Sequence, residues 1–312
     1  MAQPPAPQTA SPDSTRFFIG IGAEKAGTSW LDRRLREHPQ VWMPPHKEIH
    51  YFDQLYLDLG PRIRRVKYGR LQKEIAAATA DDLADPVILA RLRWFAAQGL
   101  VHTMDDEWYL GLFAEARRTH PVVGEITPAY AVIGEQGFRH MARLLPGVRI
   151  IFLMRHPVDR LWSAIRYYAS RRPEANVMAS PQRTIQHALS PLGLGLAKGR
   201  YHDTLTDLAR MFDPEQLLYA FYEDIFASEE SQLAFLRRMC AFLGVDYSAA
   251  TFIGVTQTVN ATPPRPMPVE VEQALSAALA PVVDEVERML GRVPESWRSP
   301  AAAREPLSDP AM

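Results

Sequence analysis

The chain has 312 residues, 47% of them hydrophobic and 23% charged, which is typical of a folded globular protein and excludes a disordered, collagen-like or coiled-coil chain. Its 35 lysine and arginine residues nearly balance 36 aspartate and glutamate residues, and the formal net charge of −1 leaves no global basic field to hold nucleic acid or an anionic membrane. The single cysteine, Cys240, excludes a disulfide framework and a cysteine-rich zinc site.

The apolar runs are strand-sized, far shorter than the ~20 residues that a membrane-spanning helix needs. The first residues have neither the basic start nor the apolar stretch of a signal peptide, so we expect a cytoplasmic protein. Residues 1–15 and 294–312 each contain four prolines and little to bury, which predicts two flexible tails. Residues 16–293 show no repeat or Gly/Ser linker and are expected to form one domain.

Strand and helix patterns alternate within this domain. Short apolar runs predict strands at residues 16–21, 41–43, 121–126, 148–154 and 217–221. Apolar spacings of three and four predict helices at residues 28–37, over most of 67–118, and at 137–145, 159–171 and 231–243. This alternation predicts an α/β fold of the P-loop-like, three-layer kind, with a central parallel sheet flanked by helices. Ligands of such sheets bind outside the carboxyl ends of the strands, so a site is expected after residues 21 and 154.

The loop after the first predicted strand is suited to bind an anion. It runs from Gly22 to Gly27 and opens a helix, whose first N–H groups and dipole attract negative charge, while Lys25 adds a positive charge. Thr28 and Ser29 add hydroxyl donors. In the Walker pattern of nucleotide triphosphatases a lysine follows the second glycine, but here that position is Thr28. The alternative is an ordinary strand–helix turn with a surface lysine.

A second candidate anion site follows the strand at residues 148–154. Arg155 stands at its carboxyl end and Ser163 follows within the next predicted helix. A planar guanidinium can bind two phosphate oxygens at once, and a nearby hydroxyl can add a third hydrogen bond. Alone, such an arginine is more often a surface salt-bridge partner. The two elements together, at two strand ends of one sheet, favour a ligand with two anionic groups.

These motifs resemble those of the sulfotransferases that use 3′-phosphoadenosine 5′-phosphosulfate (PAPS). Residues 25–30 (KAGTSW) resemble their 5′-phosphosulfate loop, and residues 151–163 (IFLMRHPVDRLWS) resemble their 3′-phosphate motif. Residues 47–53 (KEIHYFD) are similar to a segment of the carbohydrate branch, which includes heparan sulfate glucosaminyl 3-O-sulfotransferases. Residues 124–130 (GEITPAY) and 221–225 (FYEDI) also fit, in the family's order.

The resemblance implies transfer of a sulfuryl group from PAPS to an acceptor hydroxyl by in-line displacement, with adenosine 3′,5′-bisphosphate leaving. The acceptor would be a carbohydrate or another hydroxylated metabolite. The implied catalytic residues are Lys25, Glu48 and His50, with Glu48 as general base, His50 as the competing candidate and Asp53 as a helper. The implied cosubstrate-binding residues are Lys25, Ala26, Gly27, Thr28, Ser29, Trp30, Arg155 and Ser163.

Several alternatives remain open from the sequence. Glu48 could simply pair with Lys47, and His50 could fill a polar niche. His46 and His50 lie at helical spacing but do not match the zinc-protease pattern, so no metal is expected. A kinase or nucleotide triphosphatase would use ATP and Mg²⁺, and a nucleotide-binding regulator would bind PAPS without turnover.

Two features bear on the acceptor. Heparan-type enzymes often carry lysine at the position of Ile126, so this chain departs from them at that point. A basic cluster could bind an anionic acceptor or form a solvated helix face; its members are Arg62, Arg64, Arg65, Lys67 and Arg70.

Overall fold

The computed structural model describes residues 15–57, 60–79, 82–100, 103–190, 195–257 and 265–298. Its core is one parallel sheet of five strands in the order β2-β3-β1-β4-β5. The strands are β1 (Arg16–Gly22), β2 (Val41–Trp42), β3 (Val122–Ile126), β4 (Arg149–Met154) and β5 (Leu217–Phe221). The strand predictions are therefore confirmed to within two residues at each end. Of the expected tails at residues 1–15 and 294–312, residues 1–14 and 299–312 lie outside the described residues.

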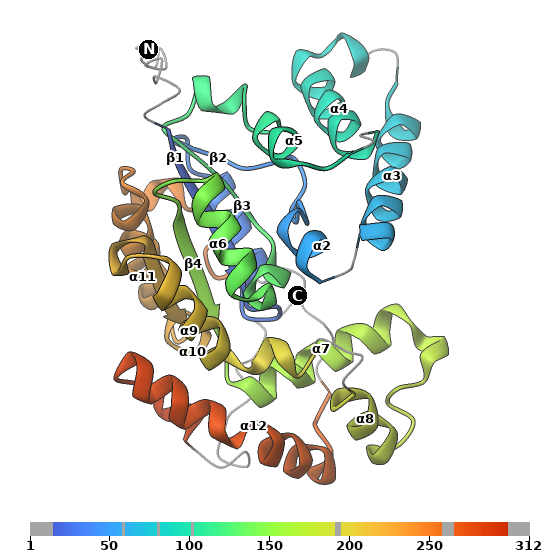
Figure 1. Ribbon diagram of the computed structural model, residues 1–312, viewed down its shortest axis with the longest axis vertical. Helices are drawn as coiled ribbons and strands as arrows, with labels where there is room; N and C mark the ends of the chain where they lie inside the picture. The colour runs from blue at the N-terminus through green and yellow to red at the C-terminus, as the bar shows by residue number, and fades with distance from the viewer. Residues whose placement is uncertain are drawn as a thin grey trace.

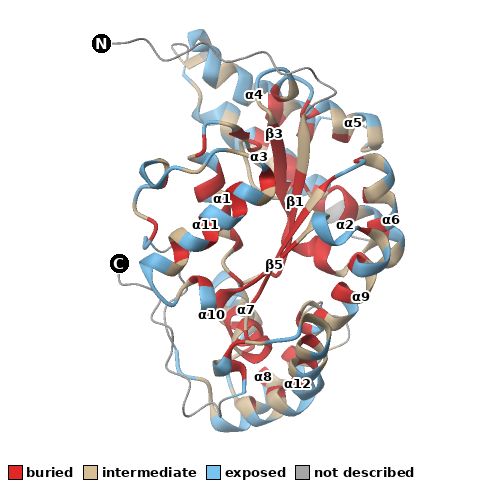
Figure 2. Cartoon of the chain, turned by 90° about the vertical axis from the view of Figure 1, so that its left-hand side faces the viewer, coloured by how far each residue is buried: buried red, intermediate tan, exposed pale blue. Residues whose placement is uncertain are grey.

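The central strands are buried on both faces, which explains why their sequences are continuous apolar runs rather than alternating ones. All five residues of β3 are buried, as are Ile150 to Met154 in β4. Figure 2 shows these strands as a buried band between helices that are exposed on their outer sides. Gly124 permits close packing inside this band, because a Cβ at that position would lie 2.3 Å from the side chain of Phe18 on β1.

Helices cover both faces of the sheet (Figures 1 and 2). Helices α1 (Thr28–Arg36) and α11 (Glu229–Leu243) lie on one side, and α6 (Gly134–Leu144) and α9 (Tyr201–Met211) lie on the other. The remaining helices are α2 (Phe52–Tyr56), α3 (Gly60–Ala77), α4 (Pro86–Gly99), α5 (Asp106–Gly111), α7 (Pro157–Arg171), α8 (Pro181–Ala188), α10 (Tyr222–Ile225) and α12 (Val269–Leu290). The predicted three-layer α/β fold is confirmed.

Helix boundaries follow local chemistry. Pro157 stands at the start of α7, where its missing N–H costs no helical hydrogen bond. Gly244 ends α11 with a φ of 65°, a left-handed conformation that glycine adopts without strain. Helices α2, α8, α9, α10 and α12 were not predicted from the sequence. No helix within the described residues is long and apolar enough to span a membrane.

The described chain stays packed past the expected domain boundary at residue 293. A short 3₁₀ turn, Glu295–Trp297, buries the indole of Trp297 to 3% exposure. Its Nε1–H donates to Glu223 Oε2 at 2.9 Å. The folded part therefore includes residues that the proline count assigned to the C-terminal tail.

Candidate functional site

The site residues predicted from the sequence come from segments that leave the carboxyl ends of the strands. The loop of residues 23–27 follows β1, residues 43–50 follow β2, Thr127 follows β3, and Arg155 follows β4. Because all five strands are parallel, these segments emerge at the same edge of the sheet. This common edge brings together residues that lie more than a hundred positions apart in the sequence.

The loop after β1 opens helix α1 with a tight turn. Gly27 is the residue before the helix and has a φ of 88°, and Lys25 also adopts a left-handed φ of 67°. Ala26 between them is fully buried, so it anchors the loop to the core. A Cβ on Gly27 would lie 2.9 Å from the Phe226 ring, which leaves room only for glycine. The first N–H groups of α1, which have no partner within the helix, open from this turn.

The two predicted anion-binding cations lie at neighbouring strand ends. One guanidinium nitrogen of Arg155 donates to the backbone carbonyl of Lys25 at 3.3 Å, and its guanidinium carbon lies 4.5 Å from the centre of the Tyr222 ring. Lys25 Nζ lies 4.6 Å from the centre of the Tyr167 ring on α7. The structure thus joins the loop after β1 to the residue after β4.

Ser163 and Trp30, which were also predicted to lie around the cosubstrate, are both buried. Ser163 is buried on α7, about two turns from the helix start. Trp30 is buried in the core, where its Nε1–H donates to the carbonyl of Val255 at 2.7 Å. Its ring packs against Phe226 and Phe235, so the indole has a packing role.

Lys47 is a further candidate site residue, which the sequence suggested only as a partner for Glu48. Its Nζ donates to Thr28 Oγ1 at 3.0 Å and to Ser29 Oγ at 3.4 Å, and it lies 3.8 Å from Glu48 Oε1. One ammonium group therefore connects the candidate anion-binding loop to the candidate base. Burial lowers the pKa of Lys47, while the charge of Glu48 opposes that effect.

The candidate base belongs to a chain of three charged side chains. His50 Nε2 lies 3.1 Å from Glu48 Oε2, and His50 Nδ1 lies 2.7 Å from Asp53 Oδ2. Asp53 is fully buried, whereas about a third of the Glu48 side chain is exposed. The exposed end of this chain is Glu48, which leaves its carboxylate accessible to a substrate.

The pKa shifts follow from this arrangement. Burial acts to raise the pKa of Glu48, but the hydrogen bond from His50 and the charge of Lys47 outweigh it and lower the pKa to about 2. Burial acts to lower the pKa of His50, but the hydrogen bonds to Asp53 and Glu48 raise it to about 9. At neutral pH Glu48 is ionised and His50 is protonated.

Some members of the basic cluster on α3 are exposed and others are buried. Arg64 and Arg65 are exposed, which is the solvated helix face considered from the sequence. Lys67 is 2% exposed, with its Nζ 3.4 Å from Met104 Sδ and 4.6 Å from the centre of the Trp108 ring, and burial lowers its pKa to about 7. The half-buried Arg70 carries a charge that helps to lower the pKa of Glu48. The side chain of Arg62 lies outside the description.

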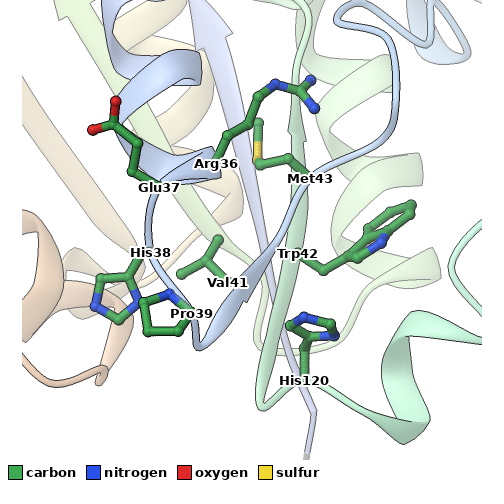
Figure 3. Close-up of a pocket in the computed structure, with 8 residues that line it drawn as sticks. All are labelled: Arg36, Glu37, His38, Pro39, Val41, Trp42, Met43 and His120. Carbon is green, nitrogen blue, oxygen red and sulfur yellow. The ribbon is translucent and has the colours of Figure 1, made fainter. Parts of the chain in front are cut away.

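One open pocket lies away from this edge, and no metal-ligand group accompanies the site among the described residues. The pocket lies around the C-terminal end of α1, strand β2 and His120, which precedes β3 (Figure 3). It therefore lies toward the amino ends of the strands, and none of its lining residues belongs to the predicted site. Within the described residues, no group of three or more His, Cys, Asp and Glu side chains is arranged to hold a metal ion.

Comparisons with known proteins cover most of the chain. A family model described as the sulfotransferase family matches residues 17–249. The solved structure of a sulfotransferase from Alicyclobacillus acidocaldarius is 25% identical and has a TM-score of 0.60, covering 91% of this chain and 99% of that chain. The sulfotransferase domain of the olefin synthase from Synechococcus PCC 7002 is 17% identical with a TM-score of 0.45, covering 88% of this chain and 98% of that chain. No curated protein matches the chain significantly.

Proposed function

Because the chain belongs to the sulfotransferase family, we propose that it transfers a sulfuryl group from PAPS to a hydroxyl of a carbohydrate or another hydroxylated metabolite. Glu48 is the general base in this proposal. The observation that carries it is the position of Lys47 Nζ, which lies 3.0 Å from the Thr28 hydroxyl of the anion-binding loop and 3.8 Å from the Glu48 carboxylate. A sulfuryl group next to that loop would then be within reach of an acceptor held by Glu48.

The residues at the carboxyl edge fit a ligand with two separated anionic groups. Lys25, Lys47, the hydroxyls of Thr28 and Ser29 and the first N–H groups of α1 would hold a 5′-phosphosulfate. Arg155 and Ser163 would hold a 3′-phosphate. PAPS supplies a sulfuryl group that is already activated by a phosphate leaving group. The cations also neutralise the charge that gathers on that phosphate as it leaves, which is typically worth about 10²–10³ in rate per preorganised group.

The protonation states of Glu48 and His50 favour Glu48 as the base. His50, with a pKa of about 9, already carries a proton at neutral pH and donates to both carboxylates, so it orients Glu48 rather than accepting a proton. Glu48 is ionised and accepts the acceptor's proton as that oxygen bonds to sulfur and the bond from sulfur to the phosphate oxygen breaks. A pKa of about 2 makes Glu48 a weak base. The attacking oxygen becomes strongly acidic as it bonds to sulfur, so a weak base suffices late in the step.

The first test is calorimetric titration of the protein with adenosine 3′,5′-bisphosphate, beside ATP with Mg²⁺. We expect the bisphosphate to bind, Arg155→Ala to lose most of that binding, and Arg237→Ala, an exposed arginine on α11, to keep it. Glu48→Gln should bind the bisphosphate normally but transfer label from PAPS to a hydroxyl acceptor about 10²–10⁴ times more slowly. Binding of ATP alone would favour a kinase or nucleotide triphosphatase, and full activity of Glu48→Gln would remove the base assignment.

A further inference from the structure

The backbone that carries the candidate base is bent in an unusual way. Glu48 has a φ of 71° and His50 a φ of 56°, so two non-glycine residues adopt the left-handed conformation on either side of Ile49. Side chains with a Cβ rarely occupy this region, and they persist there only where the surrounding structure holds them. Ile49 is fully buried and fixes the middle of the bend. The ends of the bend need another constraint.

That constraint comes from the segment that leaves β3. The N–H of Ile49 donates to Glu125 Oε2 at 3.1 Å, the N–H of His50 lies 3.5 Å from Thr127 Oγ1, and the N–H of Tyr51 donates to the Tyr130 hydroxyl at 2.8 Å. Three successive backbone donors are thus taken by three side chains of one short segment. These side-chain contacts constrain the backbone on both sides of the bend.

The three side chains are themselves linked through one buried carboxylate. Thr127 Oγ1 donates to Glu125 Oε2 at 2.6 Å, and the Tyr130 hydroxyl donates to Glu125 Oε1 at 2.7 Å. Glu125 is 1% exposed, and burial raises its pKa while these donors oppose the rise. Loss of one hydroxyl would leave both a backbone N–H and a carboxylate oxygen short of a partner in the core.

We propose that Glu125, Thr127 and Tyr130 form a clamp that positions the Glu48 carboxylate by fixing the N–H groups of Ile49, His50 and Tyr51. The inference rests on the proposed role of Glu48. The clamp residues themselves face the backbone and are positioning residues. A misplacement of about 1 Å at a reacting group can cost about 10²-fold in rate. The clamp contacts begin at Ile49, after Lys47, and the other groups proposed to bind the cosubstrate lie on other segments. The clamp therefore acts mainly on the transfer step and changes cosubstrate binding little.

Tyr130→Phe tests the clamp, and Tyr109→Phe is its matched control. The Tyr109 hydroxyl also points at Glu125 Oε1, at 3.3 Å, but it does not contact the backbone of residues 49–51. We expect Tyr130→Phe to lower kcat by about 10–10²-fold with the KM for PAPS changed less than about threefold. Tyr109→Phe should keep kcat within about threefold of the wild type. A second pair, Thr127→Val and Thr127→Ser, removes and restores the hydroxyl at nearly constant shape, and the serine variant should recover activity.

The hydrogen–deuterium exchange rate of the backbone amides in residues 46–52 measures how firmly the clamp holds this segment, independently of activity. Faster exchange in this peptide in Tyr130→Phe, with slow exchange kept in β4, would support it. Unchanged exchange in this peptide, or equal losses of kcat in Tyr130→Phe and Tyr109→Phe, would overturn it. Absence of sulfuryl transfer by the wild-type protein would instead contradict the proposed function, so the two failures are distinguishable.

Discussion

Single residues at the site act through their charge and their partners. His50 donates to a buried carboxylate, Asp53, and to a partly exposed one, Glu48, and this pair of acceptors keeps it protonated. Lys47 faces Glu48 from the other side. The carboxylate is therefore held between two positive groups, which fixes its protonation state and its direction before any substrate binds.

This arrangement predicts a pH-dependent contribution to stability. The pKa of His50 rises from 6.5 to about 9 on folding, so its stabilising effect is complete below about pH 6.5 and disappears as the pH rises through 9. The pKa of Glu48 falls from 4.5 to about 2, so its effect is complete above about pH 4.5 and disappears as the pH falls through 2. Both effects are complete between pH 4.5 and 6.5.

Denaturant unfolding of the wild type and His50→Gln from pH 6 to 10 measures the first effect. The difference in free energy of unfolding should be on the order of 1–3 kcal/mol at pH 6 and shrink toward pH 10. His187→Gln is the control with opposite sign, because burial lowers the pKa of His187, and its difference should grow as the pH rises. A difference for His50→Gln that is constant over this range would contradict the charged hydrogen-bond chain.

At the level of elements, the sequence predicted those strands and helix ends that depend on a local residue pattern. The apolar run of residues 148–154 marks β4, and the glycine at 244 marks the end of α11. Helix α12 has apolar residues at helical spacing, but Pro281 inside it weakens that pattern. The spacing of Ile63, Lys67 and Leu71 also contained a signal, since it places Lys67 on an apolar face.

The contacts that build the site could not be predicted in the same way. The contact of Lys47 with Thr28 joins residues 19 positions apart on different segments, and Glu125 lies 76 positions from Ile49. No local periodicity encodes such pairs, because they depend on strand order and on the parallel sheet bringing its carboxyl ends to one edge. Motif resemblance indicated that these segments belong together, and the structure shows which atoms meet.

The loop that opens α1 gives a prediction at this scale. Gly27→Ala should lower the free energy of unfolding by about 1–3 kcal/mol, since φ is 88° and the new Cβ would lie 2.9 Å from the Phe226 ring. Gly69→Ala, inside α3 with nothing within 4 Å of the new Cβ, should instead raise it by about 0.5–1 kcal/mol. Chemical denaturation of the two variants measures the contrast. Equal effects would mean that the turn does not require glycine.

Across the whole molecule, segments far apart in the sequence form hydrogen bonds to the elements that carry the candidate site residues. Residues after α11 return to α1, where Ile253 and Val255 accept hydrogen bonds from Arg34 and Trp30. Next to the edge strand β5, Glu223 accepts a hydrogen bond at 2.8 Å from the N–H of His156, the residue directly after Arg155. The backbone of Arg155 is also held by the hydroxyl of Tyr201, which donates to its carbonyl at 2.7 Å.

Near the C-terminal end of the described chain, Trp297 contacts Glu223, so substitutions of Trp297 test how these long-range contacts stabilise the fold. The indole donates to Glu223 Oε2 and its ring lies 5.1 Å from that of Phe221 and 6.1 Å from that of Tyr201. Trp297→Ala should lower the free energy of unfolding by about 3–5 kcal/mol through the lost packing. Trp297→Phe keeps a ring but leaves Glu223 without one donor, at a cost of about 1–3 kcal/mol.

Because Glu223 also holds the N–H next to Arg155, Trp297→Phe should weaken calorimetric binding of adenosine 3′,5′-bisphosphate as well as stability. Trp108→Phe is the matched control: its indole likewise donates to one acceptor, the carbonyl of Ala97, but it lies on α5, away from Arg155. The stability of Trp108→Phe should fall less, because this hydrogen bond is exposed and water can replace it, while the affinity for the bisphosphate stays unchanged. Equal affinities in the two variants would mean that the C-terminal turn stabilises the fold without shaping the proposed 3′-phosphate site.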